Sequence, residues 1–168
     1  DVLCNTAWTT QNDAEWCNVS SNGLGSGILT ASYTQNLIAS ERTAYITVSV
    51  EGLEPVVVTV VQAGALPVLT VEPGNFDVDT LGGNVTFNVT SNAAWTASTE
   101  SDWCTLSASG NGNGSISVDY LQNTWAAPRI ASIIINVDGL EPVTVTITQD
   151  AAIPLVIVTP ENINIDEY

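Results

Sequence analysis

The chain has 168 residues, of which eighteen are acidic, two are Arg (Arg42 and Arg129) and none is Lys or His, so its formal net charge is −16. This charge argues against nucleic acid as a partner, because phosphates are bound by Lys and Arg, and it disfavours anionic membrane surfaces. Without His or Lys the chain cannot build an ordinary Ser-His-Asp triad, an imidazole base or a Schiff-base amine. No segment approaches the roughly 20 apolar residues of a membrane-spanning helix. We therefore expect no catalytic residue, no cofactor, no metal and no membrane insertion.

A repeat of 87 residues runs through almost the whole chain. Residues 5–8 and the triplet Glu15-Trp16-Cys17 recur as residues 92–95 and Asp102-Trp103-Cys104. The same spacing relates Tyr33 to Tyr120, Asn36 to Asn123, Arg42 to Arg129, Gln62 to Gln149 and Pro67 to Pro154. A period of this length is that of a domain. We predict a first unit at residues 1–65 that lacks its first strand, a complete second unit at 66–152, and at 153–168 either the first strand of a further repeat or a donor strand.

Taken in chain order, the second unit is a series of strand-like stretches separated by Gly, Asn, Pro and Ser. Apolar sequence resumes at Val68, directly after a short linker at residues 62–67, and apolar residues then alternate with polar ones at 85–89, 116–120, 131–137 and 143–147. A period of two gives each strand one apolar face, which two sheets bury between them. The sequence therefore predicts an all-β fold of tandem immunoglobulin-like β-sandwiches, joined by a linker too short for much bending.

Glycine marks two of the expected connections. Gly110, Gly112 and Gly114 alternate with Asn residues and predict a flexible loop before the strand at 116–120. The Asp138-Gly139 pair predicts a turn with positive φ at the glycine. Pro142 should then lie at the start of the last strand, where its missing N–H does least harm.

The recurring tryptophans and arginines are expected to serve the fold. Because they keep their positions in both units, we predict that four Trp side chains pack in the cores: Trp8, Trp16, Trp95 and Trp103. The two Arg residues are the only cations, and each is predicted to donate to carbonyls or a carboxylate near the sheet rim.

Three cysteines give a weak indication of the redox compartment. Cys17 and Cys104 share one repeat position and are predicted to be small buried apolar residues. Cys104 is predicted to be a free thiol, because Ser91 stands where the first unit has Cys4. A Cys4–Cys17 disulfide remains the alternative for the first unit.

The ordered set of motifs resembles the BACON domain, an immunoglobulin-like module of Bacteroidota. The set consists of an Asn-Ala-Ala-Trp-like entry, the acidic-Trp pair, the Gly-rich stretch, a Tyr-x-x-Asn motif, an Arg six residues later and a closing Thr-x-x-Gln, and it occurs twice. The resemblance implies a secreted, periplasmic or cell-surface protein, often linked to glycan-degrading enzymes or lipoproteins. For this family both carbohydrate or mucin binding and a spacer role have been considered, and no catalytic residue is implied. Cys17 and Cys104 depart from the larger aliphatic residue expected at their position.

Trp125 is a candidate carbohydrate contact, because its counterpart is Ile38 and the shared fold does not require Trp there. An exposed indole can stack on a sugar ring, and amides from Asn111, Asn113 and Asn123 could bond hydroxyls if their loops converge. The alternative is an aromatic loop residue that folds over the end of the sandwich.

The end of the chain repeats the start of the second unit. Val156, Ile157, Val158, Ile163 and Ile165 occupy the positions of Leu69, Thr70, Val71, Phe76 and Val78. Such a segment could complete the first unit of another copy of the chain, head to tail. The alternative is a fragment of a longer repeat array.

These observations lead to one functional expectation and one alternative. We expect a non-enzymatic structural or adhesive protein, such as a stalk, spacer or filament unit, at the cell surface, in the extracellular space or in the periplasm. Its expected partners are copies of itself through the C-terminal strand. The alternative is a carbohydrate-binding module of a glycan-degrading or surface-binding protein, with a glycan as its partner.

Overall fold

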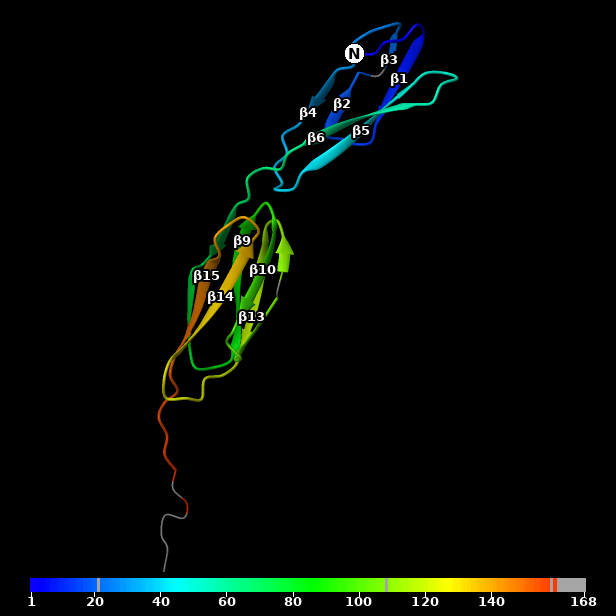
Figure 1. Cartoon of the computed structure of the whole chain (residues 1–168). Coiled ribbons are helices and arrows are strands. Elements are labelled where there is room, and N and C mark those ends of the chain that lie inside the picture. The colour runs from blue at the N-terminus through cyan, green and yellow to red at the C-terminus, as the bar shows by residue number, and fades with distance from the viewer. Residues whose placement is uncertain (21, 108, 158, 160–168) are drawn as a thin grey trace, which may run out of the picture. The chain divides into compact units, whose positions relative to one another are not determined.

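The computed structural model describes residues 1–20, 22–107, 109–157 and 159 (Figure 1). These residues form strands and no helix, so the predicted all-β class is confirmed. Accordingly, no helix long and apolar enough to cross a membrane occurs among them. The chain separates into two compact units with a boundary between Val68 and Leu69. We call residues 1–68 unit one and the residues from Leu69 onward unit two.

Unit two is a sandwich of two sheets. One sheet has the strand order β12-β10-β14-β15-β8 and the other β11-β13-β9-β7. Neighbouring strands are antiparallel except β8, which runs parallel to β15 with Phe76 opposite Ile147. The strands are β7 (Leu69–Glu72), β8 (Asn75–Val78), β9 (Gly83–Ser91), β10 (Ala94–Thr99), β11 (Cys104–Leu106), β12 (Ser109–Asn111), β13 (Gly114–Tyr120), β14 (Arg129–Val137) and β15 (Val143–Gln149). Figure 1 shows β14 and β15 side by side in this unit.

The apolar residues that alternate with polar ones in the sequence form the core of unit two. Inward-facing residues of β9, β13, β14 and β15 are completely buried, among them Phe87, Ile116, Ile133 and Ile147. Phe76 of β8 meets Phe87 edge to face, with ring centroids 5.0 Å apart. The first strands of the unit therefore cover the core that the later strands build.

Unit one contains β1 (Ala7–Asn12), β2 (Cys17–Val19), β3 (Asn22–Leu24), β4 (Ala31–Tyr33), β5 (Arg42–Ser49) and β6 (Val56–Gln62). They form one sheet of order β3-β1-β5-β6 and a second sheet of β2 and β4 alone. Its buried core consists of Trp8, Cys17, Ala44 and Ile46. Among its described residues, no strand takes the place that β7 or β8 takes in unit two.

The prediction of a flexible Gly-rich loop is wrong. Residues 109–111 form β12, which pairs with β10, and a tight turn follows at Gly112, whose φ is 71°. A Cβ at Gly110 would lie 2.2 Å from the indole of Trp95, and Trp95 Nε1 donates to the Gly112 carbonyl at 2.9 Å. Glycine is thus required here because the tryptophan packs against the backbone. By contrast, the turn at Gly139 is confirmed, with φ of 79° and β15 starting directly after Pro142.

The core role predicted for four tryptophans is confirmed for only two. Trp8 and Trp95 are each 3% exposed. Trp16 and Trp103 are half-buried, because each packs against the core on one side and against an arginine on the other. The guanidinium carbons of Arg42 and Arg129 lie 4.4 and 4.1 Å from the respective ring centroids. This cation–π contact adds to the carbonyl bond predicted for the arginines, which Arg129 makes to Leu121 at 2.7 Å.

All three cysteines are free in the structure, so the alternative Cys4–Cys17 disulfide is not formed. Cys17 and Cys104 are buried, as predicted. Burial raises the pKa of the Cys104 thiol from 9.0 to about 11, an effect that the nearby Arg129 partly offsets. A buried thiol held in its protonated form is a poor nucleophile.

Candidate functional site

An exposed apolar surface of unit one lies along β6, the last strand of its sheet. Val56 and Val58 face the core side of β6 but remain 63% and 40% exposed. A groove of about 350 Å³ lies beside them, lined by Asp1, Val2, Leu3, Leu29, Val48, Val56 and Val58. We call this the β6 groove. Its lining is almost entirely aliphatic, so it offers surface for packing and little for chemistry.

Unit two shows what covers the equivalent surface. Val145, the repeat counterpart of Val58, is 1% exposed because β8 and β7 lie over it. The β15 backbone is bonded on this side too: Thr146 N donates to the Gly74 carbonyl and Asp150 N to the Val78 carbonyl, both at 3.0 Å. Thr59 and Ala63 hold the matching positions of unit one, and no described strand lies on that side of β6. An edge of this kind is a template for an added strand.

A second repeated feature fastens the outgoing chain to each unit. In unit two Asn123 is 1% exposed, and its Nδ2 donates to the carbonyls of Ala127 and Asp150, each at 2.8 Å. In unit one Asn36 makes the same two bonds, to Ser40 at 2.8 Å and Ala63 at 3.2 Å. We call this arrangement the asparagine clamp.

Backbone hydrogen bonds also hold the linker residues that follow each clamp. Ala65 N donates to the Ile38 carbonyl and Ala152 N to the Trp125 carbonyl, both at 2.8 Å. In unit one the linker packs so closely that a Cβ at Gly64 would lie 2.1 Å from the Ala39 carbonyl oxygen. Each unit therefore fixes the direction in which the chain leaves it.

The four residues of the candidate carbohydrate site do not come together. Trp125 is 76% exposed in the loop after β13, whereas Asn111 and Asn113 lie before the first residue of β13. The seven residues of β13 separate the two groups by about 20 Å. Asn113 accepts a bond from Ser91 N at 3.0 Å, and the amide of Asn123 is committed to the clamp. Only Asn123 lies beside Trp125, where its Oδ1 accepts a bond from Trp125 N at 3.1 Å, and the loop of Asn111 and Asn113 does not converge with them.

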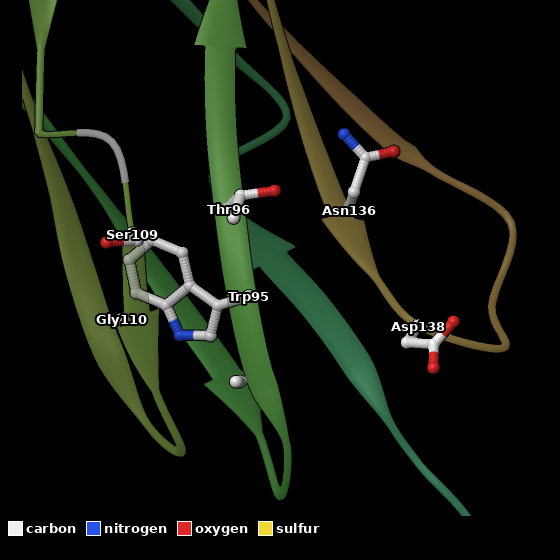
Figure 2. A pocket seen from close by; sticks show the side chains of 7 residues that line it. Trp95, Thr96, Ser109, Gly110, Asn136 and Asp138 are labelled. Atoms are coloured by element: carbon white, nitrogen blue, oxygen red, sulfur yellow. The ribbon is translucent and has the colours of Figure 1, made fainter.

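A shallow hollow on the outer face of the β12-β10-β14 sheet was not anticipated from the sequence. It has a volume of about 490 Å³ and is lined by Ala94, Trp95, Thr96, Ser109, Gly110, Asn136 and Asp138. Figure 2 shows Trp95 beside Gly110, with Asn136 on β14 and Asp138 directly after that strand. Because Trp95 is only 3% exposed, the hollow has polar side chains but no aromatic platform on which a sugar could stack.

The interior provides no further candidate among the described residues. Every buried side-chain nitrogen or oxygen found there has a hydrogen-bond partner, so no polar group in this part of the chain points toward a missing ligand. The same part of the chain holds no group of three or more His, Cys, Asp or Glu residues placed to bind a metal.

Comparisons with known families match both units. The model of the viral BACON domain matches residues 68–152, just over half of the chain. The BACON model, described as a putative binding domain, N-terminal, matches residues 6–63. The chain belongs to the BACON family. Its two units are tandem BACON-type domains, as the sequence resemblance implied.

Solved structures show more distant likenesses to these BACON domains. A Bacteroides ovatus GH5 xyloglucanase in complex with a XXXG heptasaccharide is 22% identical with a TM-score of 0.47, over 51% of this chain and 19% of that one. An NMR structure of a protein from Bacteroides thetaiotaomicron is 19% identical with a TM-score of 0.35, over 47% and 77%. WR4, a C. elegans MSP family member, is 17% identical with a TM-score of 0.36, over 50% and 97%. At these values the likenesses carry no argument about function. The comparison with curated proteins found no match.

The candidate donor residues lie partly outside the described structure. Val156 and Ile157 are 86% and 73% exposed, whereas Val158, Ile163 and Ile165 fall outside the described residues. The asparagine clamp was missed at the sequence level. Its signal was present, since Asn36 and Asn123 recur at the repeat spacing in loops that otherwise differ.

Proposed function

We propose that this chain is a non-catalytic structural part of a protein outside the cytoplasm, in which tandem BACON domains act as a semi-rigid spacer or stalk. The observation that carries the proposal is the asparagine clamp, present with the same bonds in both units. A module whose purpose is to hold a partner at a distance must control the direction in which the chain leaves it. A flexible linker would defeat that purpose.

Composition supports the same role. A net charge of −16 on 168 residues keeps a protein soluble and makes copies and neighbouring domains repel one another. The chain also has no Lys or His, which removes the usual bases of enzymatic chemistry.

The spacer role predicts a narrow distribution of distances between the units. We would attach one fluorophore or spin label to each unit and measure that distribution for the wild-type chain, Asn36→Ala and Asn123→Ala. Asn36→Ala should broaden it, because Asn36 fastens the linker between the units. Asn123→Ala is the matched control, since it removes the same bonds from the chain that leaves unit two and should not affect the distance.

A second variant covers the case in which Asn36→Ala unfolds unit one. Gly64→Ala pushes the linker away from the Ala39 carbonyl without removing a buried polar side chain, and should also broaden the distribution. A wild-type distribution as broad as that of both variants would show a flexible linker and overturn the spacer role.

A carbohydrate-binding module is the second candidate, and exposed Trp125 is the observation in its favour. Saturable binding on a glycan panel that is lost in Trp125→Ala would support it. Trp125→Ile, which copies unit one, tests whether stacking of the indole is required. Equal binding by all three proteins, or none, would leave the spacer as the better description.

A further inference from the structure

We propose that unit two carries mechanical tension along the chain, because β8 and β15 form a pair that a pull on the chain loads in shear. We call residues 74–78 and 146–150 the load-bearing pair. This property rests on the proposed structural role and adds resistance to force to it. A spacer transmits any load that acts on the domains at its two ends, so each of its domains must stay folded under that load.

The chain enters and leaves unit two at opposite ends of the sandwich. Its first strand residue, Leu69, pairs with Ser91 at one end of β9. After the last strand, the carbonyl of Asp150 accepts a bond from Asn123, which follows the opposite end of β9 and β13. A pull on the chain therefore draws Leu69 and Asp150 apart along the direction of the strands.

This pull acts on two parallel neighbours. In β8 and β15, Phe76 lies opposite Ile147 and Val78 opposite Gln149. Tension on the incoming chain draws β8 backwards along its length, whereas tension on the outgoing chain draws β15 forwards. Because ladder bonds run across the strands, this sliding stretches all of them together, whereas opening the pair from one end breaks them one after another. Sliding by one residue would also turn Phe76 away from the core, where its ring meets Phe87.

Backbone hydrogen bonds hold both ends of the load-bearing pair. At its start, Thr146 N donates to the Gly74 carbonyl at 3.0 Å. At its end, Asp150 N donates to the Val78 carbonyl, also at 3.0 Å. Neither end of the pair is therefore free to open first.

Side chains strengthen the same pair. Asn75 Oδ1 accepts bonds from the hydroxyls of Thr146 and Thr148, at 2.8 and 3.2 Å. Gln149 Nε2 donates to the Leu81 carbonyl at 3.0 Å, beyond the end of β8. The last strand thus holds the incoming segment by its backbone, by its side chains and by the residues that follow it.

Pulling the same protein in two directions tests the proposal. In the first direction, a constant force acts through the two ends of the 168-residue chain. In the second, it acts through the N-terminal end and a handle on the Glu141→Cys variant. Glu141 is exposed in the connection between β14 and β15, at the end of the sandwich where Leu69 enters, so this pull opens the strands from one end. Unit two should survive about tenfold longer or more in the first direction, because forced unfolding follows the unfolding rate.

Two features of the design keep the comparison clean. All chains carry Cys4→Ser, and the other two native thiols, Cys17 and Cys104, are buried, so the handle reacts with the introduced thiol. Unit one is in the path of the force in both directions. Its lifetime should therefore be the same in both and serves as the internal reference.

A matched pair of variants locates the load. Asn75→Ala removes side-chain bonds from the load-bearing pair and should shorten the lifetime of unit two several-fold when force acts through the chain ends. Asn84→Ala is the control, because Asn84 is also exposed and donates across strands, to Ser117 and Asp119, each at 2.8 Å. Those bonds join β9 to β13, neither of which is pulled directly, so the lifetime should change little.

The outcomes separate this proposal from the spacer role. Equal lifetimes in the two directions, or equal losses from Asn75→Ala and Asn84→Ala, would overturn the load-bearing pair. They would leave the spacer role intact, because that role is judged by the distance between the units. A broad distance distribution together with direction-dependent lifetimes would instead overturn the spacer role and leave the load-bearing pair standing.

Discussion

Val58 in unit one and Val145 in unit two occupy the same position of the repeat, yet the first is 40% exposed and the second 1%. Both side chains point to the same face of equivalent strands, β6 and β15. The difference is that β8 pairs with β15 on the edge away from β14, whereas among the described residues no strand pairs with β6 on the edge away from β5. The pattern of a strand sets which face is apolar, but burial is decided by strands that lie far away in the sequence.

Other parts of the two units are alike. Trp8 and Trp95 are equally buried, and both donate through Nε1 to a glycine carbonyl at 2.9 Å. The asparagine clamp is the same in both. The two units thus differ at the edge of β6 away from β5 and in the second sheet, while the tryptophan contact and the asparagine clamp are common to both.

The largest expected effect comes from removing the centre of the complete core. Phe87→Ala should destabilise unit two by about 3–5 kcal/mol, as large-to-small aromatic changes do, and should leave unit one unaffected. Hydrogen exchange followed by mass spectrometry would report the two units separately. Tyr45→Ala, at a 50% exposed position of unit one, is the surface control. A loss in unit two no larger than that of the control would contradict the closed core described for it.

Removing the asparagine clamp should lower the free energy of unfolding of each unit by about the same amount. Asn123→Ala and Asn36→Ala each strip carbonyls of a buried partner, which costs about 1–3 kcal/mol. Chemical denaturation monitored for each unit would measure both losses. A loss confined to one unit would show that the two clamps differ in strength although each consists of the same pair of bonds.

Substitutions of Val58 and Val145 test the difference in burial between the two units. Val145→Ala removes two buried methyl groups and should cost about 1.6 kcal/mol, at about 0.8 kcal/mol for each group. Val58→Ala should cost less than about 1 kcal/mol, because water already reaches the side chain. Equal losses in dilute solution would mean that β6 is as well covered as β15.

The last expected effect is a pH dependence of unit two, which is confined to alkaline pH. The folded state raises the pKa of Cys104 to about 11, from 9.0, so it keeps the proton at pH values where the unfolded chain has lost it. The stability that this contributes is complete below about pH 9 and is lost as pH rises through about 11. Thermal melts of the wild type and Cys104→Ala should converge or cross over this range. Parallel curves would show that the thiol does not titrate differently on unfolding.

Much of the fold could be predicted because it depends on local pattern. The alternation along β14 and β15 predicted their buried faces, and Asp138-Gly139 predicted its turn. The Gly-rich stretch was misread, because Gly110 is required by the Trp95 indole, and no local pattern shows which distant side chain packs on a glycine. The candidate carbohydrate residues were grouped by type, but the length of β13 holds Asn113 and Trp125 apart.

Amide hydrogen exchange along β6 and β15 tests most directly whether one edge is open and its counterpart closed. Thr146 N and Asp150 N are bonded to β8 and its flanking residue Gly74, so they should exchange slowly. Thr59 N and Ala63 N, their repeat counterparts, should exchange quickly, because no described strand pairs with this edge of β6. If Thr59 and Ala63 are as protected as Thr146 and Asp150 at high dilution, unit one has no open edge.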